Sequence, residues 1–407
     1  DQEEKLHHVS DVADENSGGN CSMKSAERSV IFLAKHLDSG GVTTHMMTLA
    51  KGLQVRGWKV SLVSAGAVGN HHHTPEWFET EGIRHYHFEF VKDDPVHTLA
   101  WYPISLLRFR RIIDAERPNL LHVHWRSTSL YAKFIELTRG IPFVSTLHSN
   151  NIPAGFFFRT VSFWGERAIA ISSETREYLK SAFGVSASKI VTIFHGVDTT
   201  RFRVPDLEER ARARARFGIV PELPVVSLVG RLEPVKRHDL ALKAMLHLRK
   251  RGLEIQLIFA GEGSLRRKLE ETCIEWGIRH RVHFVGFTDV REVYWASDIC
   301  ILPSDNEGFP MTMVEAMACG VPVIRTIGPG ANDQVQDGVT GYLIPPGDSK
   351  ALADRIANLI TNPDVHSRFS QAAKLYAEQH FSHARMVEQT ISVYESVLAN
   401  VRAISSA

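Results

Sequence analysis

Residues 299–326 read ICILPSDNEGFPMTMVEAMACGVPVIRT. An apolar run, ICIL, leads into a polar loop, and a helix-forming segment opens at Pro310 and stops at Gly320 before a second apolar run, PVIRT. The order strand, loop, helix, strand is typical of a parallel sheet with helical connections. Uninterrupted apolar strands also favour a sheet covered on both faces, because a sheet with one wet face would alternate polar and apolar residues.

The same alternation recurs along most of the chain, in two series separated by a charged stretch at residues 206–219. We therefore predict an α/β fold of two Rossmann-like, doubly wound parallel-sheet domains, residues 29–198 and 199–382, that face a central cleft. Residues 1–28 are polar and lack periodicity, which predicts a flexible tail. The apolar runs are SVIFLA, KVSLVSA, LLHVHW, PFVSTLH, RAIAIS and KIVTIF in the first series, and PVVSLVG, EIQLIFAG, VHFVG, ICILPS, PVIRT and GYLIP in the second.

The last segment, residues 383–407, is predicted to be a helix with one apolar face. Such a face needs a surface to cover. The residues on this face recur at spacings of 4, 3, 4 and 3, and they are Val387, Ile391, Tyr394, Leu398 and Val401.

Charge and composition exclude several classes of protein. Lys and Arg total 47 against 46 for Asp and Glu, so no global basic field attracts nucleic acid, and we interpret the run ARARARF as a solvated helix face. No apolar stretch approaches the roughly 18–20 residues of a membrane span and no signal-peptide pattern is present, so we expect a cytoplasmic protein. The four cysteines lie far apart without a CxxC pair, which favours neither disulfides nor structural zinc.

The loop and helix after residue 302 carry the densest set of candidate site residues. Free N–H groups at the helix start favour a phosphate, and Gly308 lets the backbone approach it. Glu307 and Glu315 are placed to grip sugar hydroxyls, although either alone is as easily a cap or a surface residue. Arg231, just past the strand PVVSLVG, and Lys236 can converge on one anion; the alternative is two solvated charges.

Two further candidates come from the first half of the chain. Gly40 and Gly41 form a loop between the first strand, expected at 29–37, and a helix expected at 42–56, but they lack the GxGxxG pattern and the acidic residue of a dehydrogenase. His148 ends the strand PFVSTLH at the edge where cleft residues gather. His122 and His124 share one strand face, where we favour packing or cleft lining over metal binding, and we assign no role to the loop histidines 71–73.

The string from Glu307 to Pro322, with seven residues between Glu307 and Glu315, resembles the signature of the retaining glycosyltransferases of family 4, which have the GT-B fold. This resemblance implies that Glu307 contacts the donor sugar and Glu315 the nucleotide ribose. It also implies that residues 383–407 cross back onto the N-terminal domain. The other residues to which it assigns donor or catalytic roles are Arg231 and Lys236 beside the diphosphate, Gly40 and Gly41 near donor and acceptor, the cleft histidine His148, and the backbone of Gly308, Phe309, Pro310, Met311 and Thr312.

Two departures from the family pattern affect the expected site. His195 stands where the family often has Asn before Gly-Val-Asp, and Asn332-Asp333 replaces Pro-Glu after a glycine pair. Asp333 keeps a carboxylate but shortens it by one methylene.

The resemblance implies transfer of a hexose from a nucleotide-diphosphate sugar to an acceptor hydroxyl with retained configuration, in glycoconjugate or polysaccharide biosynthesis. The acceptor is a glycan, lipid or small molecule. We expect no metal or other cofactor, because no Asp-x-Asp pair occurs. Segments 156–159 and 106–113 are candidates for peripheral contact with an anionic membrane, although core packing with a solvated face is the favoured interpretation. The alternatives are a GT-B-like epimerase or phosphorylase and a non-catalytic sugar-nucleotide-binding protein.

Overall fold

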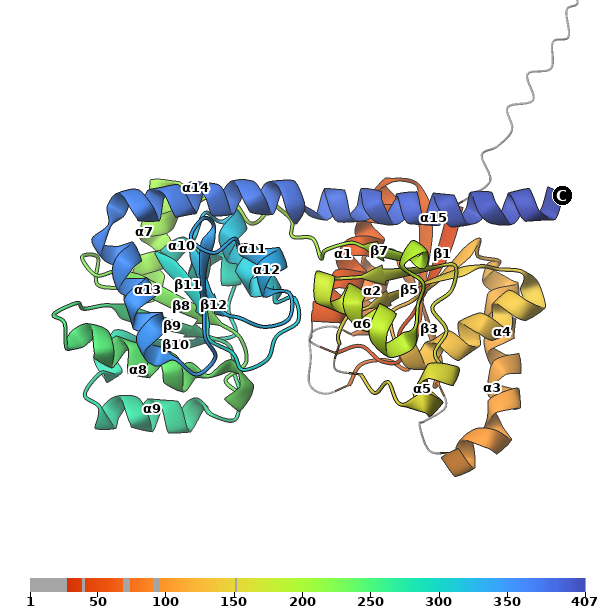
Figure 1. Cartoon of the computed structure of the whole chain (residues 1–407), viewed down its shortest axis with the longest axis horizontal. Helices are drawn as coiled ribbons and strands as arrows, with labels where there is room; N and C mark the ends of the chain where they lie inside the picture. The colour runs from red at the N-terminus through yellow and green to blue at the C-terminus, as the bar shows by residue number, and fades with distance from the viewer. Residues whose placement is uncertain (1–27, 39–40, 69–73, 91–94, 151, 407) are drawn as a thin grey trace, which may run out of the picture.

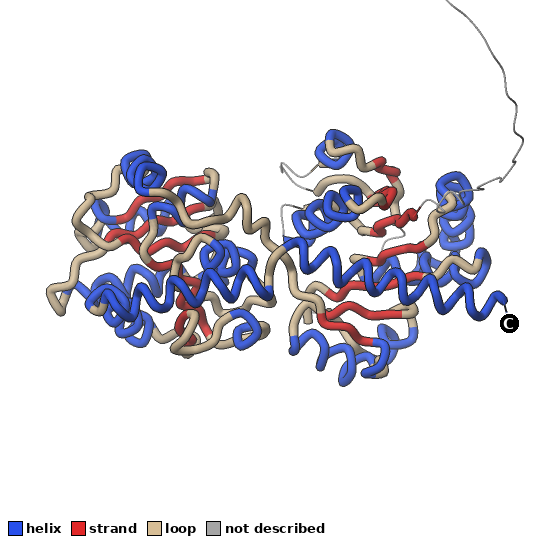
Figure 2. Tube along the Cα trace, turned by 90° about the horizontal axis from the view of Figure 1, so that it is seen from above, coloured by secondary structure: helices blue, strands red, loops and turns tan. Residues whose placement is uncertain are grey.

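The computed structural model describes residues 28–38, 41–68, 74–90, 95–150 and 152–406. The chain forms two α/β domains that lie side by side, joined by a narrow connection (Figures 1 and 2). The predicted tail, Gly40 and the loop histidines 71–73 fall outside the described residues, except for Arg28. No helix within the described part of the chain combines the length and the apolar character needed to cross a bilayer.

A seven-stranded sheet, parallel throughout and ordered β3-β2-β1-β4-β5-β6-β7, forms the N-terminal domain. The first strand ends at Leu33, earlier than the sequence suggested; beyond it Leu37 only bridges Ala67. The strands are β1 (Arg28–Leu33), β2 (Trp58–Ser64), β3 (Arg84–His87), β4 (Leu120–Val123), β5 (Phe143–Leu147), β6 (Arg167–Ala170) and β7 (Ile190–Thr192).

Helices cover both faces of this sheet. Val30 and Phe32 belong to one apolar cluster, and Ile31 and Leu33 to another, as the alternation of side chains along a strand requires. Both clusters are closed to water, which accounts for the continuously apolar strand sequence. The helical segments are α1 (Gly41–Val55), α2 (Pro75–Thr80), α3 (Pro95–Glu116), η1 (Arg126–Thr128), α4 (Ser129–Arg139), α5 (Phe156–Thr160), α6 (Ser173–Phe183) and η2 (Ala187–Lys189).

The C-terminal domain repeats this plan with a parallel six-stranded sheet, ordered β10-β9-β8-β11-β12-β13. Its strands are β8 (Val225–Val229), β9 (Gln256–Ala260), β10 (Val282–Gly286), β11 (Ile299–Leu302), β12 (Val323–Thr326) and β13 (Gly341–Ile344). Its helical segments are α7 (Leu207–Arg216), η3 (Pro234–Lys236), α8 (His238–Arg249), α9 (Arg266–Glu275), η4 (Arg279–Arg281), α10 (Val290–Ala296), α11 (Met311–Ala318), α12 (Ala331–Gln334), α13 (Ser349–Thr361) and α14 (Pro363–His380).

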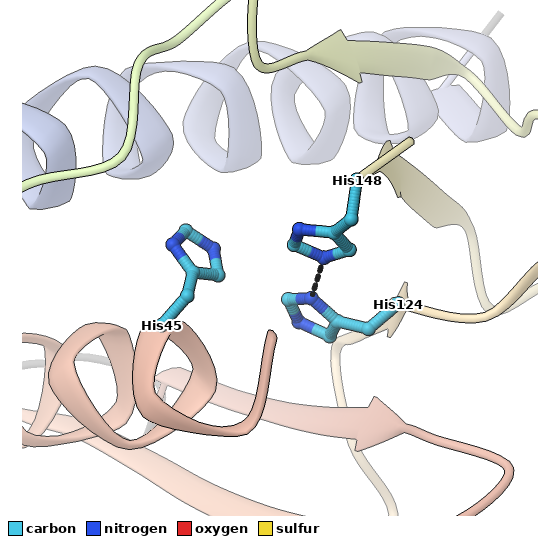
Figure 3. A group of neighbouring side chains, drawn as sticks. All are labelled: His45, His124 and His148. Carbon is cyan, nitrogen blue, oxygen red and sulfur yellow. Dashed lines mark hydrogen bonds between the residues drawn. The ribbon is translucent and has the colours of Figure 1, made fainter. Parts of the chain in front are cut away.

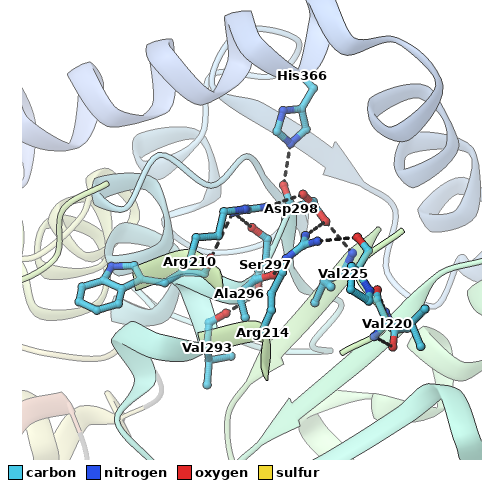
Figure 4. Close-up of polar contacts among 12 residues, drawn as sticks. Arg210, Arg214, Val220, Val225, Val293, Ala296, Ser297, Asp298 and His366 are labelled. Atoms are coloured by element: carbon cyan, nitrogen blue, oxygen red, sulfur yellow. Dashed lines mark hydrogen bonds and ion pairs between the residues drawn. The ribbon is translucent and has the colours of Figure 1, made fainter. Parts of the chain in front are cut away.

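The arginine run in α7 is only partly a solvated face. Arg210 and Arg214 turn inward and pair with the two carboxylate oxygens of Asp298, at 2.6 and 2.7 Å (Figure 4). His366 of α14 contacts the carbonyl of Asp298 through Nε2 at 2.9 Å. The expectation of a solvated face was therefore wrong for Arg214 of the run, because its partner lies 84 positions away in the sequence, and Arg210, which directly precedes the run, has the same partner. These bonds fasten α7 and α14 to the start of β11.

The chain crosses between the domains twice, and the two crossings are hydrogen-bonded to each other. The N–H of Val197 donates to the carbonyl of Phe381 at 2.7 Å, and the N–H of His383 donates to the carbonyl of Val197 at 2.9 Å. A Cβ on Gly196 would lie 2.5 Å from Cα of His383, so this close approach requires glycine. The paired segments form the narrow connection that is visible from above (Figure 2).

Helix α15 (His383–Ser406) leaves the second crossing and runs along the N-terminal domain, nearly in line with α14 (Figure 1). Val387 and Tyr394 are fully buried there. The contact with α1 is tight, because a Cβ on Gly52 would lie 2.3 Å from a methyl group of Val387. The Tyr394 hydroxyl also reaches Nδ1 of His122 at 2.6 Å, so the last helix contributes both apolar and polar contacts to the N-terminal core.

Candidate active site

The loop after β11 brings the predicted donor residues to the edge of the C-terminal sheet. α11 begins at Met311 with Pro310 as its N-cap residue, one position later than the sequence suggested. Gln334 holds this start by donating from Nε2 to the carbonyl of Pro310 at 3.0 Å. A Cβ on Gly308 would lie 4.0 Å from the carbonyl oxygen of His148, so the donor loop and the predicted cleft histidine face each other across the two domains.

Glu307 and Lys236 are joined in an ion pair. Their side chains are only 14% and 18% exposed, so each charge depends on the other for its solvation. The family resemblance implies that Glu307 contacts the sugar and Lys236 the diphosphate, but it does not reveal that the two side chains meet. A ligand entering here meets a neutralised pair rather than a free carboxylate and a free ammonium group.

Glu315 lies in α11, where the hydroxyl of Tyr294 donates to its Oε2 at 2.8 Å. Burial raises the pKa of Glu315 above its usual value, and the hydrogen bond from Tyr294 partly offsets this rise. The carboxylate is therefore fixed in direction and poorly hydrated. Such a group binds a pair of sugar hydroxyls with little loss of side-chain entropy.

Two arginines on the predicted donor side differ in their exposure. Arg231 is exposed just beyond β8, which leaves its guanidinium accessible to an anion. Arg325 is only 1% exposed and donates to Gln334 and to the carbonyl of Pro329. Burial lowers the pKa of Arg325 to about 10, so it remains charged at neutral pH behind the start of α11. No sequence pattern pointed to Arg325, because it lies in an otherwise apolar strand.

His148 belongs to a chain of histidines on the N-terminal domain. Its Nε2 lies 3.1 Å from Nδ1 of His124, and its Nδ1 lies 3.2 Å from Nε2 of His195. His45 of α1 stacks on His195 with ring centroids 4.3 Å apart. His45, His124 and His148 surround a common space (Figure 3). His122 is separate in function, since its two nitrogens bond Tyr394 and Thr146 in the core.

Burial and crowding keep these rings uncharged. Burial, followed by repulsion from the neighbouring histidines, lowers the pKa of His45 and of His148 well below the ordinary value. Burial alone lowers the pKa of His195 to about 4. At neutral pH the cluster therefore presents imidazoles rather than imidazolium ions, which can accept a proton or a hydrogen bond.

A cavity of about 170 Å³ opens beside His124 and His148. Its lining is mainly apolar and aromatic, with a few polar groups, as is usual for small-molecule sites. It lies on the N-terminal domain, where an acceptor is expected. The remaining lining residues include Val42, Trp125, Arg126, Ile152, Phe163 and Trp164.

The outcome for the remaining predicted residues is mixed. Gly41 begins α1 with open space around it, since a Cβ there would meet nothing within 4 Å. Gly40 lies outside the described residues. Both departures from the family pattern lie at the boundary between the domains: His195 joins the histidine chain, and Asp333 accepts two hydrogen bonds from Ser173. His45 and the role of Ser173 were missed, because neither residue belongs to a local pattern.

Two family models match this chain. The model described as Glycosyl transferases group 1 matches residues 209–376, and the model described as Glycosyltransferase Family 4 matches residues 39–201. An uncharacterized glycosyltransferase of Methanocaldococcus jannaschii is 24% identical over 376 residues, covering 88% of this chain and 94% of the relative. A D-inositol 3-phosphate glycosyltransferase of Mycobacteroides abscessus is 27% identical over 394 residues, covering 90% and 86%.

Solved structures share the fold. A glycosyltransferase from Rickettsia africae superposes with a TM-score of 0.80 at 20% identity, covering 92% of this chain and all of that one. Anabaena HepE in complex with UDP superposes with a TM-score of 0.79 at 21% identity, covering 90% of this chain and all of that one. Both confirm the predicted arrangement of two parallel-sheet domains.

Proposed function

We propose that this chain, which belongs to the group 1 glycosyltransferases with a family 4 N-terminal domain, transfers a hexose from a nucleoside-diphosphate sugar to an acceptor hydroxyl with retained configuration. The observation that carries the proposal is the approach of the loop at Gly308 to His148 across the two domains. This approach places a donor loop with an oriented helix start opposite a histidine-lined cavity, as group transfer between two bound molecules requires.

The donor occupies the C-terminal domain in this proposal. Glu315, held by Tyr294, binds the ribose hydroxyls, and the backbone N–H groups at the start of α11 bind phosphate oxygens. UDP-glucose is the first donor to test, because a structure of Anabaena HepE contains it. Glu307 contacts the transferred sugar while Lys236 shares its charge with the diphosphate.

The leaving diphosphate is stabilised without a divalent metal in this proposal. Because Glu307 already neutralises Lys236, the uncompensated positive charge comes from Arg231, from the field of Arg325 and from the α11 dipole of about +0.5 charge. The acceptor enters from the cavity beside His148. The departing diphosphate oxygen and the incoming hydroxyl share one face of the sugar, which gives retention. His148 orients the acceptor hydroxyl through its uncharged imidazole, which requires one ring nitrogen to leave His124 or His195, and the hydroxyl proton passes to the departing diphosphate oxygen.

The decisive experiment is a donor panel with mass spectrometry of the product and NMR of its anomeric centre. We expect nucleoside diphosphate and a glycosylated product with retained configuration, in excess EDTA as well as in magnesium. Nucleoside diphosphate release without an acceptor product would favour hydrolysis, and phosphate-dependent cleavage or a changed donor sugar would favour the phosphorylase or epimerase. Donor binding without turnover on any acceptor would favour a binding protein.

His148→Ala tests the acceptor side. We expect turnover to fall by at least a hundredfold while donor affinity changes less than threefold, because His148 lies on the domain opposite to the donor residues. His87→Ala is a control that removes an imidazole from β3, at the edge of the sheet. Wild-type kinetics for His148→Ala would remove this residue from the site.

We also propose that the protein acts in the cytoplasm, in the synthesis of a glycoconjugate or polysaccharide. It would bind peripherally to an anionic lipid surface. Ile104 and Leu107 are 45% and 54% exposed on α3, beside the exposed Arg108 and Arg111. Of the other apolar residues of this segment, Phe109 and Ile113 are buried and Leu106 and Ile112 are half-buried. In the second predicted segment, Phe156 is 86% exposed and offers a further apolar contact. We expect the protein to float with anionic but not with neutral vesicles, and we expect Leu107→Asp to abolish this flotation.

The cysteines support the proposed compartment. The three described cysteines are buried and free, which suits a reducing compartment, and they are Cys273, Cys300 and Cys319.

A further inference from the structure

Three histidines from separate parts of the N-terminal domain point toward a common space (Figure 3). His45 comes from α1, His124 follows β4 and His148 follows β5. One nitrogen of each ring lies within 4.8 Å of the corresponding nitrogens of the other two. The parallel sheet brings them together, because the ends of β4 and β5 are adjacent at its edge.

We propose that His45, His124 and His148 bind one borderline transition-metal ion, such as Zn²⁺, and that the bound ion inhibits sugar transfer by occupying His148. The binding part of this inference stands on the geometry of the three rings. The inhibitory part rests on the proposed function, in which His148 meets the acceptor.

The distances already approach those of a metal centre. Zn–N bonds of 2.0–2.1 Å in a tetrahedral site separate the ligand nitrogens by roughly 3.3 Å. Nδ1 of His124 and Nε2 of His148 are 3.1 Å apart, held by a proton that one of them carries. An ion would replace this proton, which passes to the second nitrogen of the same ring. His45 then needs to move by no more than about 1.5 Å.

An unpartnered nitrogen of His45 points to a ligand at this place. Nε2 of His124 and Nδ1 of His45 are both buried and have no hydrogen-bond partner among the residues that the structure describes, but only Nδ1 of His45 is a free nitrogen offered to the ion, because His124 binds it through Nδ1. The two side chains belong to residues that are only 3% and 9% exposed, so bulk water does not solvate them freely. Buried polar atoms of this kind are rare and call for an occupant.

A second layer of contacts supports His148 as a ligand. Its Nδ1 lies 3.2 Å from Nε2 of His195, as in metal sites whose histidine ligands are oriented through the other ring nitrogen. His195 in turn stacks on His45. The residue that departs from the family pattern therefore braces two of the three proposed ligands.

The chemistry of the donor set selects the ion. Three imidazoles without a carboxylate in the group favour Zn²⁺, Co²⁺, Ni²⁺ or Cu²⁺ over the oxygen-seeking Mg²⁺ and Ca²⁺. His148 is partly exposed and lines the cavity, so a water molecule can complete the coordination. His122 is not included, since both its nitrogens have partners in the core.

The test measures Zn²⁺ binding by equilibrium dialysis in a background variant, with histidines 71–73 changed to alanine so that this run cannot bind the ion. We expect one Zn²⁺ per chain at micromolar or lower free concentration. His124→Asn and His45→Asn should each weaken binding at least tenfold. As a matched control, His283→Asn removes a partly buried histidine of β10 in the other domain and should bind as the background does.

A second measurement guards against variants that fail to fold. In the unsubstituted chain, Zn²⁺ should raise the melting temperature in a concentration-dependent way, and Mg²⁺ should not. No stoichiometric binding below about 100 μM, a value far weaker than ordinary three-histidine sites, would overturn the site. Binding that survives both His45→Asn and His124→Asn would overturn it equally.

The inhibition is tested separately. In the background variant, Zn²⁺ should inhibit transfer with the affinity found by dialysis, EDTA should reverse the effect, and His45→Asn should shift inhibition to at least tenfold higher Zn²⁺. Full transfer activity at saturating Zn²⁺ would disprove the proposed inhibition but would not contradict the metal site itself. If the chain transfers no sugar at all, the proposed function fails, while dialysis and melting still decide the metal site.

Discussion

Asp333 of the C-terminal domain and Ser173 of the N-terminal domain are joined by two hydrogen bonds, which together form an interdomain clasp. Oδ2 of Asp333 accepts a hydrogen bond from the N–H of Ser173 at 2.6 Å, and its Oδ1 accepts one from the hydroxyl at 2.7 Å. Next to this clasp, the N–H of Gly330 donates to Glu174 at 2.8 Å. These contacts bridge the domains in addition to the paired crossings, and they limit how far the cleft can open.

Breaking the clasp should loosen the domains without unfolding them. Asp333→Ala removes both solvent-exposed bonds from a half-buried residue, so we expect a loss of less than about 1 kcal/mol in unfolding free energy but a larger radius of gyration in small-angle scattering. Ser181→Ala is the control, because its hydroxyl bonds only Glu177 within α6. Identical scattering for Asp333→Ala and wild type would show that the clasp does not hold the domains.

The Glu307–Lys236 pair should show strong coupling in a double-mutant cycle. Glu307→Gln or Lys236→Met alone leaves one largely buried group without its partner, which costs about 1–3 kcal/mol of unfolding free energy. The double variant should lose less than the sum of the singles. Chemical denaturation measures all four proteins, and additive losses would mean that the pair contributes no coupling energy.

The bond from Tyr294 to Glu315 should matter for nucleotide binding. Glu315→Ala should weaken donor affinity by about 1.5–3 kcal/mol, because it removes hydrogen bonds to a charged group. Tyr294→Phe should weaken it less, since the carboxylate stays but loses its orientation. Titration calorimetry with the nucleoside diphosphate measures both. Glu271→Ala, at a 65% exposed carboxylate of α9, is the control. Unchanged affinity for Glu315→Ala would rule out the ribose contact.

His238 should make the fold sensitive to acid. It is fully buried against Phe259, and burial, followed by repulsion from Lys236, lowers its pKa from 6.5 to about 4. Between these values the unfolded chain binds a proton here that the folded chain does not. Stability is therefore lost as pH falls through this window, by up to about 1.4 kcal/mol per pH unit from this group.

His238→Leu tests this effect. Its unfolding free energy should depend less steeply on pH between 6.5 and 4 than that of the wild type, with little loss at pH 7.5, since neither ring nitrogen has a partner among the described residues. His280→Leu, at an exposed position, shows whether removing any imidazole alters the profile. A slope for His238→Leu equal to that of the wild type would contradict the assignment.

Sequence patterns were enough to predict elements but not contacts between distant side chains. Apolar runs predicted the parallel strands, because burial on both faces leaves a local signature. The segment from Glu307 to Glu315 was found for the same reason, since its loop and helix are contiguous. His45 and His148 meet only through sheet order and strand register, and Arg210 meets Asp298 only through the packing of α7. Contacts of this kind leave no periodic pattern in the local sequence.

The placement of α15 has a consequence for synthesis on the ribosome. The N-terminal domain is translated first, yet Val387 and Tyr394 belong to its core and are translated after the entire C-terminal domain. Until these residues leave the ribosome, no helix covers α1 and the surface at Gly52 that contacts Val387 in the finished fold. The nascent domain therefore exposes an apolar surface throughout translation of the second half, a state that invites chaperone binding and delays final folding until the end of the chain is free.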